Sequence, residues 1–231
     1  MARKHILVID VGGTQIKLLA SGQKERTRLP SGSRLSPRKL VKAVQKATKD
    51  WKYDVISIGV PAPVTGGRVA DDPVNLGRGW KRFDFEKAFG KPVRVMNDAA
   101  MQALGSYDGG RMLFIGLGTG LGSALIVDDV LAPLELAHMP YRDGRDFEYF
   151  VGTKGLERLG HRRWLSEVKR VVGILRIGMQ ADYVVIGGGN VKELKKLPPY
   201  SRAGSNRHAF AGGFLLWNDR KEAKRILKME D

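Results

Sequence analysis

The chain contains no cysteine and no long hydrophobic run, and each absence excludes a class of protein. Without cysteine there are no disulfides and no thiolate zinc sites. No apolar run approaches the roughly 18–20 residues that cross a bilayer. The apolar stretch at residues 6–9 is too short for the core of a secretion signal. We therefore expect a cytoplasmic protein that spans no membrane.

Acidic residues are scarce relative to basic ones. The chain has 24 Asp and Glu against 40 Lys and Arg, which gives a formal charge of +16 at pH 7. Such a surface attracts polyanions such as nucleic acid, anionic lipid, nucleotides or polyphosphate, although high charge also serves solubility alone. The 231 residues, 42% of them hydrophobic, suffice for one large domain or two modest ones, each with its own core.

The order of strand-like and Gly-rich segments repeats once along the chain. Residues 5–11 and 15–21 are apolar runs joined by Gly12-Gly13-Thr14, which is a tight-turn signal. About one hundred residues later, 113–116 and 123–127 flank the sequence Leu-Gly-Thr-Gly-Leu-Gly. The repeat predicts two similar α/β halves, each opening with a hairpin, and we expect the halves to touch across a cleft.

The two Gly/Thr turns are candidate phosphate-binding loops. Glycine lets backbone N–H groups approach a phosphate, and threonine adds a hydroxyl donor. One such turn alone is typical of a plain hairpin, but two in matching positions favour a ligand with several phosphates. Neither is a P-loop, and neither opens a helix as a dinucleotide-binding turn does. The predicted phosphate contacts are Gly12, Gly13, Thr14, Gly118, Thr119 and Gly120.

Two aspartates follow predicted strands. Asp10 lies beside the first turn, where a carboxylate would repel phosphates unless a divalent cation lies between them. We therefore expect Mg²⁺ near Asp10, with a turn-capping role as the alternative. Asp98 starts a helix after the strand 93–96, either as its cap or as a general base that accepts a proton from a hydroxyl attacking phosphorus. Asn97 offers the donor and acceptor groups that suit a polyol.

Glu135 and His138 stand three residues apart in a Pro-flanked segment, and Glu148 follows ten residues later. Carboxylates hold vicinal sugar hydroxyls well, because each carboxylate accepts more than one hydrogen bond. A Glu/His group also suits zinc. However, the other three histidines are dispersed and cysteine is absent, so metal ligation is the weaker interpretation.

These motifs, in this order, resemble the family named for repressors, open reading frames and kinases (ROK), which includes sugar kinases. The matching segments are 10–17, 59–64, 74–80, 95–100, 116–124, 135–138, 185–189 and 206–209. The resemblance implies an α/β, two-domain, actin-like and ribonuclease H-like fold with a cleft between the domains. One domain would comprise residues 1–98 plus about 206–231, and the other one residues 99–205.

The resemblance also implies roles for single residues. Asp98 matches the catalytic base, and Asp10 lies near the magnesium ion. The two Gly/Thr turns match the loops that hold the donor phosphates. The sugar hydroxyls would be held by Asn97, Glu135, His138 and Glu148, and the turn beside the nucleoside of ATP would be Gly187, Gly188 and Gly189.

The chain departs from the common family pattern at three places. The usual Cys-rich zinc motif is absent, and residues 146–160 with Trp164 instead resemble the zinc-free polyphosphate glucokinases, so no zinc is expected. Ala137 stands where glycine is usual, which would crowd the sugar loop or merely shift it. The first strand begins by residue 5, without a preceding helix-turn-helix, which disfavours a DNA-binding regulator and specific nucleic-acid binding.

Basic side chains form two stripes that bear on the phosphoryl donor. The first consists of Arg38, Lys42, Lys46 and Lys49, and the second of Lys154, Arg158, Arg162, Arg163, Lys169, Arg170 and Arg176. A solvated helix face is the ordinary explanation of such a stripe. A track for a long polyphosphate chain is the functional one, and the second stripe matches the polyphosphate-using branch.

The sequence therefore predicts a kinase that phosphorylates the 6-hydroxyl of glucose, with polyphosphate, ATP or both as donor. We expect it to act as a homodimer, which is the habit of the family. Two alternatives stay open: a non-catalytic sugar- or polyanion-binding protein that kept the fold, and an ATP-dependent kinase for another hexose. An intact Asp98 and two phosphate loops argue against a pure sensor, which needs no base.

Overall fold

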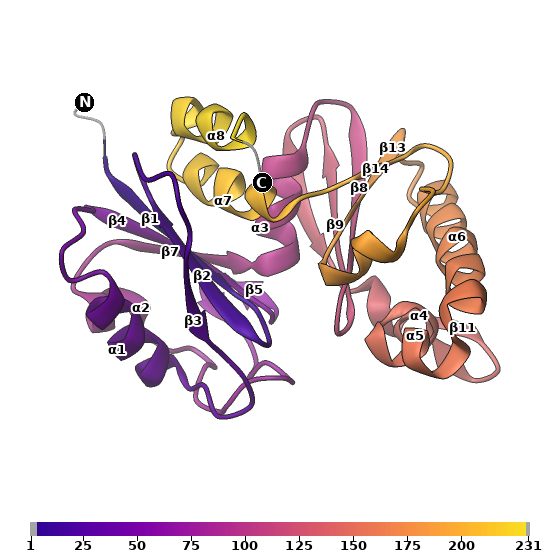
Figure 1. The fold of residues 1–231 in the computed structure, drawn as a ribbon, viewed down its shortest axis with the longest axis horizontal. Helices are drawn as coiled ribbons and strands as arrows, with labels where there is room; N and C mark the ends of the chain where they lie inside the picture. Colours follow the sequence, from indigo (N-terminus) through magenta and orange to yellow (C-terminus); the bar gives the residue numbers. More distant parts are fainter. Residues whose placement is uncertain (1–3, 230–231) are drawn as a thin grey trace. The chain divides into compact units, whose positions relative to one another are not determined.

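The computed structural model describes residues 4–229. These residues form two units, each with its own five-stranded sheet. Unit 1 comprises the chain up to Met101 together with the segment from Ala209 onward, and unit 2 comprises Gln102–His208. Figure 1 shows both units and labels most of their helices and strands. Among the described residues, no helix is long and apolar enough to cross a membrane.

The sheet of unit 1 has the strand order β3-β2-β1-β4-β7. Its strands are β1 (Ile6–Val11), β2 (Gln15–Ala20), β3 (Thr27–Pro30), β4 (Val55–Val60) and β7 (Val93–Asn97). The first three form an antiparallel meander, whereas β4 and β7 continue the sheet parallel to β1. The carboxyl ends of β1, β4 and β7 therefore lie at one edge of the sheet.

Both faces of this sheet are covered, because alternate residues of β1 enter different cores. Leu7 belongs to a core shared with Trp80 and with buried side chains of two helices, whereas Ile6 packs on the other face with Phe214. Every residue of β4 is buried, as expected for a parallel strand covered on both sides. The remaining elements of unit 1 are α1 (Pro37–Ala47), β5 (Val64–Thr65), β6 (Arg68–Val69), α2 (Phe85–Phe89) and α8 (Arg220–Leu227).

The sheet of unit 2 repeats the first one, with the order β10-β9-β8-β13-β14. Its strands are β8 (Arg111–Leu117), β9 (Leu121–Val127), β10 (Val130–Leu134), β13 (Tyr183–Gly187) and β14 (Ser201–Ala203). Again three strands form an antiparallel meander and two more run parallel to the first. The predicted duplication, with a hairpin opening each half, is confirmed.

Helices cover the sheet of unit 2 around Trp164, which is fully buried and donates its indole N–H to the carbonyl of Val151 at 3.0 Å. The further elements of this unit are η1 (Leu136–His138), β11 (Pro140–Arg142), β12 (Arg145–Asp146), α4 (Phe147–Val151), α5 (Thr153–Leu159), α6 (His161–Gly178) and η2 (Gly189–Glu193). Two helices, α3 (Asp98–Ser106) and α7 (Asn206–Leu215), each contain a boundary between the units.

Candidate functional site

The first Gly/Thr turn joins β1 to β2 in unit 1. The N–H of Gly12 donates to the carbonyl of Gln15 at 2.9 Å, and a Cβ at Gly12 would lie only 3.0 Å from the same oxygen, so the tight turn favours glycine. Gly13 is partly exposed and Thr14 is exposed. The turn therefore presents backbone and hydroxyl donors at the surface of unit 1, as a phosphate loop requires.

Asp10 sits in β1 directly opposite Lys17 of β2, and its Oδ2 lies 3.3 Å from the Lys17 ammonium group. Only 13% of the Asp10 side chain is exposed, so this carboxylate faces one cation already. Among residues 4–229 no group of three or more His, Cys, Asp or Glu side chains gathers in a way that could hold a metal ion. Asp10 thus offers a single carboxylate, which fits magnesium only where phosphates and water supply the other ligands.

Asn97 and Asp98 lie where β7 meets α3. The Asn97 side chain accepts the N–H of Ala100 at 3.0 Å, which is the bond of a helix cap, and it donates to the carbonyl of Ala62 at 3.3 Å. Asp98 accepts the N–H of Ala99 at 2.8 Å. Asn97 therefore makes the capping contact three residues ahead, which weakens the interpretation of Asp98 as merely the cap.

Gly59 of β4 allows α3 to lie close against the sheet. A Cβ at this position would collide with the Met101 side chain and would come within 3.4 Å of the Asp98 Cα. Strand β4 separates β1 from β7 in the sheet, so Asp10 and Asp98 lie at the same edge, two strand spacings or roughly 10 Å apart. Unit 1 thus brings the predicted magnesium residue and the predicted base to one edge.

The second Gly/Thr turn joins β8 to β9 in unit 2, and Glu148 lies against it. The Glu148 Oε2 accepts the N–H of Leu121 at 3.1 Å, and a Cβ at Gly120 would collide with that same oxygen. Thr119, between Gly118 and Gly120, is exposed. Glu148, predicted from the resemblance to bind sugar, therefore also contacts the turn predicted to bind donor phosphates.

The carbonyl of Gly118 in this turn accepts three hydrogen bonds. Thr153, the first residue of α5, donates its N–H at 2.9 Å and its hydroxyl at 2.8 Å. The Asn190 amide of η2 donates at 3.3 Å and also contacts the Thr153 hydroxyl at 3.1 Å. Neither residue was predicted as part of the site. For Asn190 the sequence signal was its position directly after the Gly187–Gly189 turn.

That third glycine turn, at the end of β13, packs against the same hairpin. Gly187 pairs with Gly116 in the parallel register of β13 and β8. Gly188 has φ +85°, and a Cβ there would collide with the carbonyl of Leu117, so no other residue type fits without moving the chain. Unit 2 therefore brings the predicted nucleoside turn beside the predicted donor-phosphate turn.

Glu135 directly precedes the short helix η1, His138 is its last residue, and both side chains are exposed. The buried Ser123 hydroxyl holds this segment, because it accepts the N–H of Leu136 at 3.1 Å and donates to the carbonyl of Leu134 at 3.0 Å. Ala137, which replaces the usual glycine, is buried within the hydrophobic core of unit 2.

Three neighbouring carboxylates raise the pKa of His138. Its Nδ1 lies 3.3 Å from Asp146 Oδ2, and the hydrogen bond with Asp146 raises the pKa of His138, with further help from the charges of Glu148 and Glu135. Partial burial opposes that rise. The predicted sugar residues of unit 2 are therefore close enough to share one electrostatic environment.

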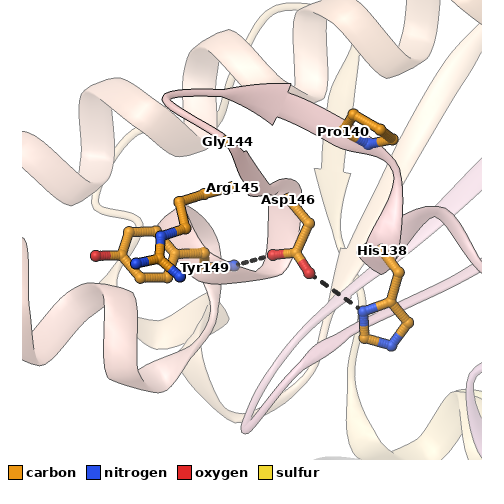
Figure 2. Close-up of a pocket in the computed structure, with 6 residues that line it drawn as sticks. All are labelled: His138, Pro140, Gly144, Arg145, Asp146 and Tyr149. Atoms are coloured by element: carbon orange, nitrogen blue, oxygen red, sulfur yellow. Dashed lines mark hydrogen bonds and ion pairs between the residues drawn. The ribbon is translucent and has the colours of Figure 1, made fainter.

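A pocket of about 370 Å³ opens next to His138 (Figure 2). Its lining residues are His138, Pro140, Gly144, Arg145, Asp146 and Tyr149. Asp146 links two of its walls, because one carboxylate oxygen faces His138 and the other accepts the N–H of Tyr149 at 2.8 Å. Arg145 lies over the Tyr149 ring, 4.9 Å from the ring centre. The glutamates 135 and 148 do not line this pocket, so it adjoins the predicted sugar group through His138 alone.

Two arginines of the second basic stripe make contacts with other residues of unit 2. Arg158 stacks on Tyr149 at 3.6 Å and donates to the carbonyl of the same residue. Arg176 donates to the carbonyl of Ala181 at 3.2 Å and lies over the Tyr200 ring. These two arginines contact the surrounding fold, although Arg158 is also exposed. The other five members of the stripe are all exposed: Lys154, Arg162, Arg163, Lys169 and Arg170. In the first stripe, Lys49 lies beyond the end of α1.

The chain matches one family profile and is similar to kinases of known name. The profile described as the ROK family matches residues 6–132, which is more than half of the chain. The chain is 25% identical over 219 residues to a polyphosphate glucokinase of Mycobacterium tuberculosis (strain CDC 1551 / Oshkosh), covering 85% of this chain and 82% of that protein. It is 26% identical over 203 residues to a polyphosphate glucokinase of Mycobacterium leprae (strain TN), covering 78% of this chain and 62% of that protein.

Solved structures show the same fold. An inorganic polyphosphate/ATP-glucomannokinase from Arthrobacter sp. strain KM superposes with a TM-score of 0.79 at 24% identity, covering 99% of this chain and 100% of that one. A glucokinase from Streptomyces griseus, in complex with glucose and AMPPNP, gives a TM-score of 0.71 at 14% identity, covering 92% and 98%. The predicted α/β, two-domain, actin-like and ribonuclease H-like fold class is thereby confirmed.

Proposed function

The chain belongs to the ROK family, and we propose that it is a sugar kinase that transfers a phosphoryl group from polyphosphate, ATP or both to the 6-hydroxyl of glucose. Its curated relatives named above are polyphosphate glucokinases, and both similar structures described are hexose kinases by name. Those names support the class of reaction. The choice of glucose among hexoses comes from the resemblance alone.

The observation that carries the proposal is the position of Glu148. Its Oε2 holds the Leu121 N–H beside the Gly118–Gly120 turn, and its charge also acts on His138. One carboxylate thus connects the group proposed to bind sugar with the turn proposed to bind donor phosphates. A kinase needs both substrates held close together, because positioning of the reacting groups supplies much of its rate.

The residues take the following roles. Asn97, Glu135, His138 and Glu148 hold the sugar hydroxyls, and Asp98 is the general base. As the 6-hydroxyl oxygen forms its bond to phosphorus, the bond from phosphorus to the departing donor oxygen breaks, and the hydroxyl proton passes to the Asp98 carboxylate. The N–H groups and hydroxyls of the two Gly/Thr turns stabilise the phosphate charge.

Asp10 is the residue that would hold magnesium. Its single carboxylate suits an ion that takes its other ligands from phosphates and water, and the Lys17 ammonium 3.3 Å away balances its charge. When bound, magnesium neutralises charge on the donor phosphates. Lys17 itself can approach the same phosphates from the neighbouring strand, since it is partly exposed.

Polyphosphate is the donor that the charge distribution favours. The net charge is +16, and several basic side chains of α5 and α6 are exposed. A linear polyanion gains from each additional cation along its path, whereas ATP ends after three phosphates. The Gly187–Gly189 turn matches the nucleoside turn of the family, so ATP is proposed as a second donor.

The test is formation of glucose 6-phosphate by the wild-type protein with magnesium, supplied with either polyphosphate or ATP, at low and high salt. Turnover with polyphosphate that weakens with salt is the expected result, because salt screens exposed charges. Turnover with ATP alone would keep the kinase and reduce the charge to a solubility feature. Absence of turnover with either donor, across several hexoses, would favour a non-catalytic sugar- or polyanion-binding protein.

A further inference from the structure

The segment that follows the Gly187–Gly189 turn carries a cluster of lysines that belongs to neither predicted basic stripe. Lys192, Lys195 and Lys196 are all exposed. The only acidic residue between Gly187 and Tyr200 is Glu193. The segment contains no aromatic residue before Tyr200, and its Val191 and Leu194 pack against the core of unit 2.

Two contacts attach this segment to the donor turn. Gly188 lies so close to Leu117 that a Cβ would collide with the Leu117 carbonyl. The Asn190 amide donates to the Gly118 carbonyl at 3.3 Å. The Cα of Lys192 is therefore within about 8 Å of the Cα of Asn190, because consecutive Cα atoms are about 3.8 Å apart. The lysines thus begin beside the turn proposed to hold the donor phosphates.

A third contact joins the segment to the start of α6. The His161 Nε2 lies 3.0 Å from the Glu193 carbonyl oxygen and 3.7 Å from its carboxylate. That contact places Arg162 and Arg163, both exposed, next to the lysine segment and engages its one carboxylate. We call Lys192, Lys195, Lys196, Arg162 and Arg163 the distal basic surface. In the part of the chain that the structure describes, none of these five side chains forms an ion pair.

We propose that the distal basic surface is a subsite for linear polyphosphate, which binds the part of the chain beyond the phosphates held at the Gly118–Gly120 turn. The inference deepens the proposed function and rests on it. A group of exposed cations, on a segment that Asn190 attaches to the donor turn, matches a ligand with a repeating negative charge. A nucleobase gains little there, because the segment offers no ring for stacking. The same reason favours polyphosphate over single-stranded nucleic acid.

The test compares donors of different length in the triple variant K192A/K195A/K196A. Long-chain polyphosphate reaches the distal basic surface, whereas inorganic triphosphate and ATP are too short to use all of it. We expect KM for long-chain polyphosphate to rise roughly tenfold at low salt. This rise corresponds to the binding free energy lost when three exposed charge contacts are removed. KM for triphosphate and ATP should stay within about twofold, and the difference should shrink at high salt.

The matched control is K221A/K224A/K228A, which removes the same charge from three exposed lysines in or next to α8 of unit 1. It should leave every KM unchanged. The proposal is overturned if the triple variant changes nothing, if it affects triphosphate as much as the long chain, or if the control variant gives the same loss. In the last case net charge, and not the distal basic surface, attracts the donor.

A binding measurement separates failure of the subsite from failure of the proposed function. Fluorescently labelled long-chain polyphosphate is titrated with wild type, triple variant and control, with no sugar present. If the wild type lacks turnover with every donor, the kinase proposal fails. If the triple variant, but not the control, then binds polyphosphate roughly tenfold more weakly, the distal basic surface is still supported as a polyphosphate subsite. A single-stranded DNA oligonucleotide that competes as well as unlabelled polyphosphate would overturn the choice of ligand.

Discussion

The two sheets have the same strand order and the same pattern of parallel and antiparallel neighbours, yet their Gly/Thr turns are held differently. In unit 1 the turn is fixed by its own hairpin and by the Ser31 N–H, which donates to the Thr14 carbonyl at 3.1 Å. In unit 2 the Gly118 carbonyl accepts bonds from two separate elements, and Glu148 holds the other end of the turn.

The ends of the outer parallel strands differ as well. In unit 1, β7 ends at Asn97, and α3 begins directly after it at Asp98. In unit 2, β14 leads into Gly204 and Ser205, whose carbonyl accepts the Gln102 amide at 3.1 Å. One duplicated scaffold thus carries the candidate base in one unit and the more firmly braced phosphate turn in the other. Duplication supplies the framework, and the side chains added at equivalent strand ends supply the chemistry.

The largest expected effect is in unit 1. Asp98→Asn keeps the shape of the side chain and an oxygen that can accept the Ala99 N–H, but it removes the proton acceptor. We expect kcat to fall about 10²- to 10⁴-fold, with sugar binding retained. Glucose 6-phosphate formation and calorimetric glucose binding measure the two quantities. Asp50→Asn, at an exposed position, is the control, and an Asp98→Asn variant with near-wild-type kcat would remove Asp98 from the mechanism.

The two turns can be compared directly by adding one methyl group to each. Gly120→Ala forces the Glu148 carboxylate away and breaks its hydrogen bond with Leu121, which should lower the free energy of unfolding by about 1–2 kcal/mol. Gly13→Ala meets nothing closer than the Asn75 Cβ at 3.8 Å, so its effect should stay within about 0.5 kcal/mol. Thermal unfolding measures both. Equal losses at the two positions would show that the turns are equally constrained.

Thr153→Val tests the bracing of the second turn. Valine keeps the shape but loses the hydroxyl that donates to Gly118 and contacts Asn190. We expect kcat/KM for the donor to fall about five- to tenfold, the value of roughly one lost hydrogen bond. Thr153→Ser restores the hydroxyl and should recover most of the activity. If both variants behave alike, the hydroxyl does not position the turn.

The smallest expected effect concerns the His138–Asp146 pair of unit 2. The pKa of His138 is raised chiefly by its hydrogen bond with Asp146, so the stability from the protonated pair is fully present below the unfolded-state pKa. It is lost as pH rises through the raised folded-state pKa. His138 is exposed and Asp146 is partly exposed, so solvent screens the pair and we expect less than about 1 kcal/mol. Unfolding of wild type and Asp146→Asn from pH 5 to 8 should differ most at the acid end. A constant difference would exclude the linkage.

Several features of the site followed from sequence because they are local. Both hairpin turns were predicted from glycine and threonine between apolar runs, and Asp98 was expected at the start of a helix after a strand. Seven strands were not predicted, because they are short or mostly exposed and lack the apolar runs of the central strands: β3, β5, β6, β10, β11, β12 and β14. The roles of the site residues and the domain boundaries stay predictions.

By itself, the sequence determined the duplicated pattern, the order of the motifs and hence the family, because these depend on residue type and spacing along the chain. Only the tertiary structure decided which side chains support the second turn. Thr153 and Asn190 lie 35 and 72 residues from Gly118, and they meet its carbonyl only after the helices have packed on the sheet. The same packing brought Asn190, two residues before Lys192, against that turn. A hydrogen bond needs its partners within about 3 Å, and no spacing in the sequence sets that distance between separate elements.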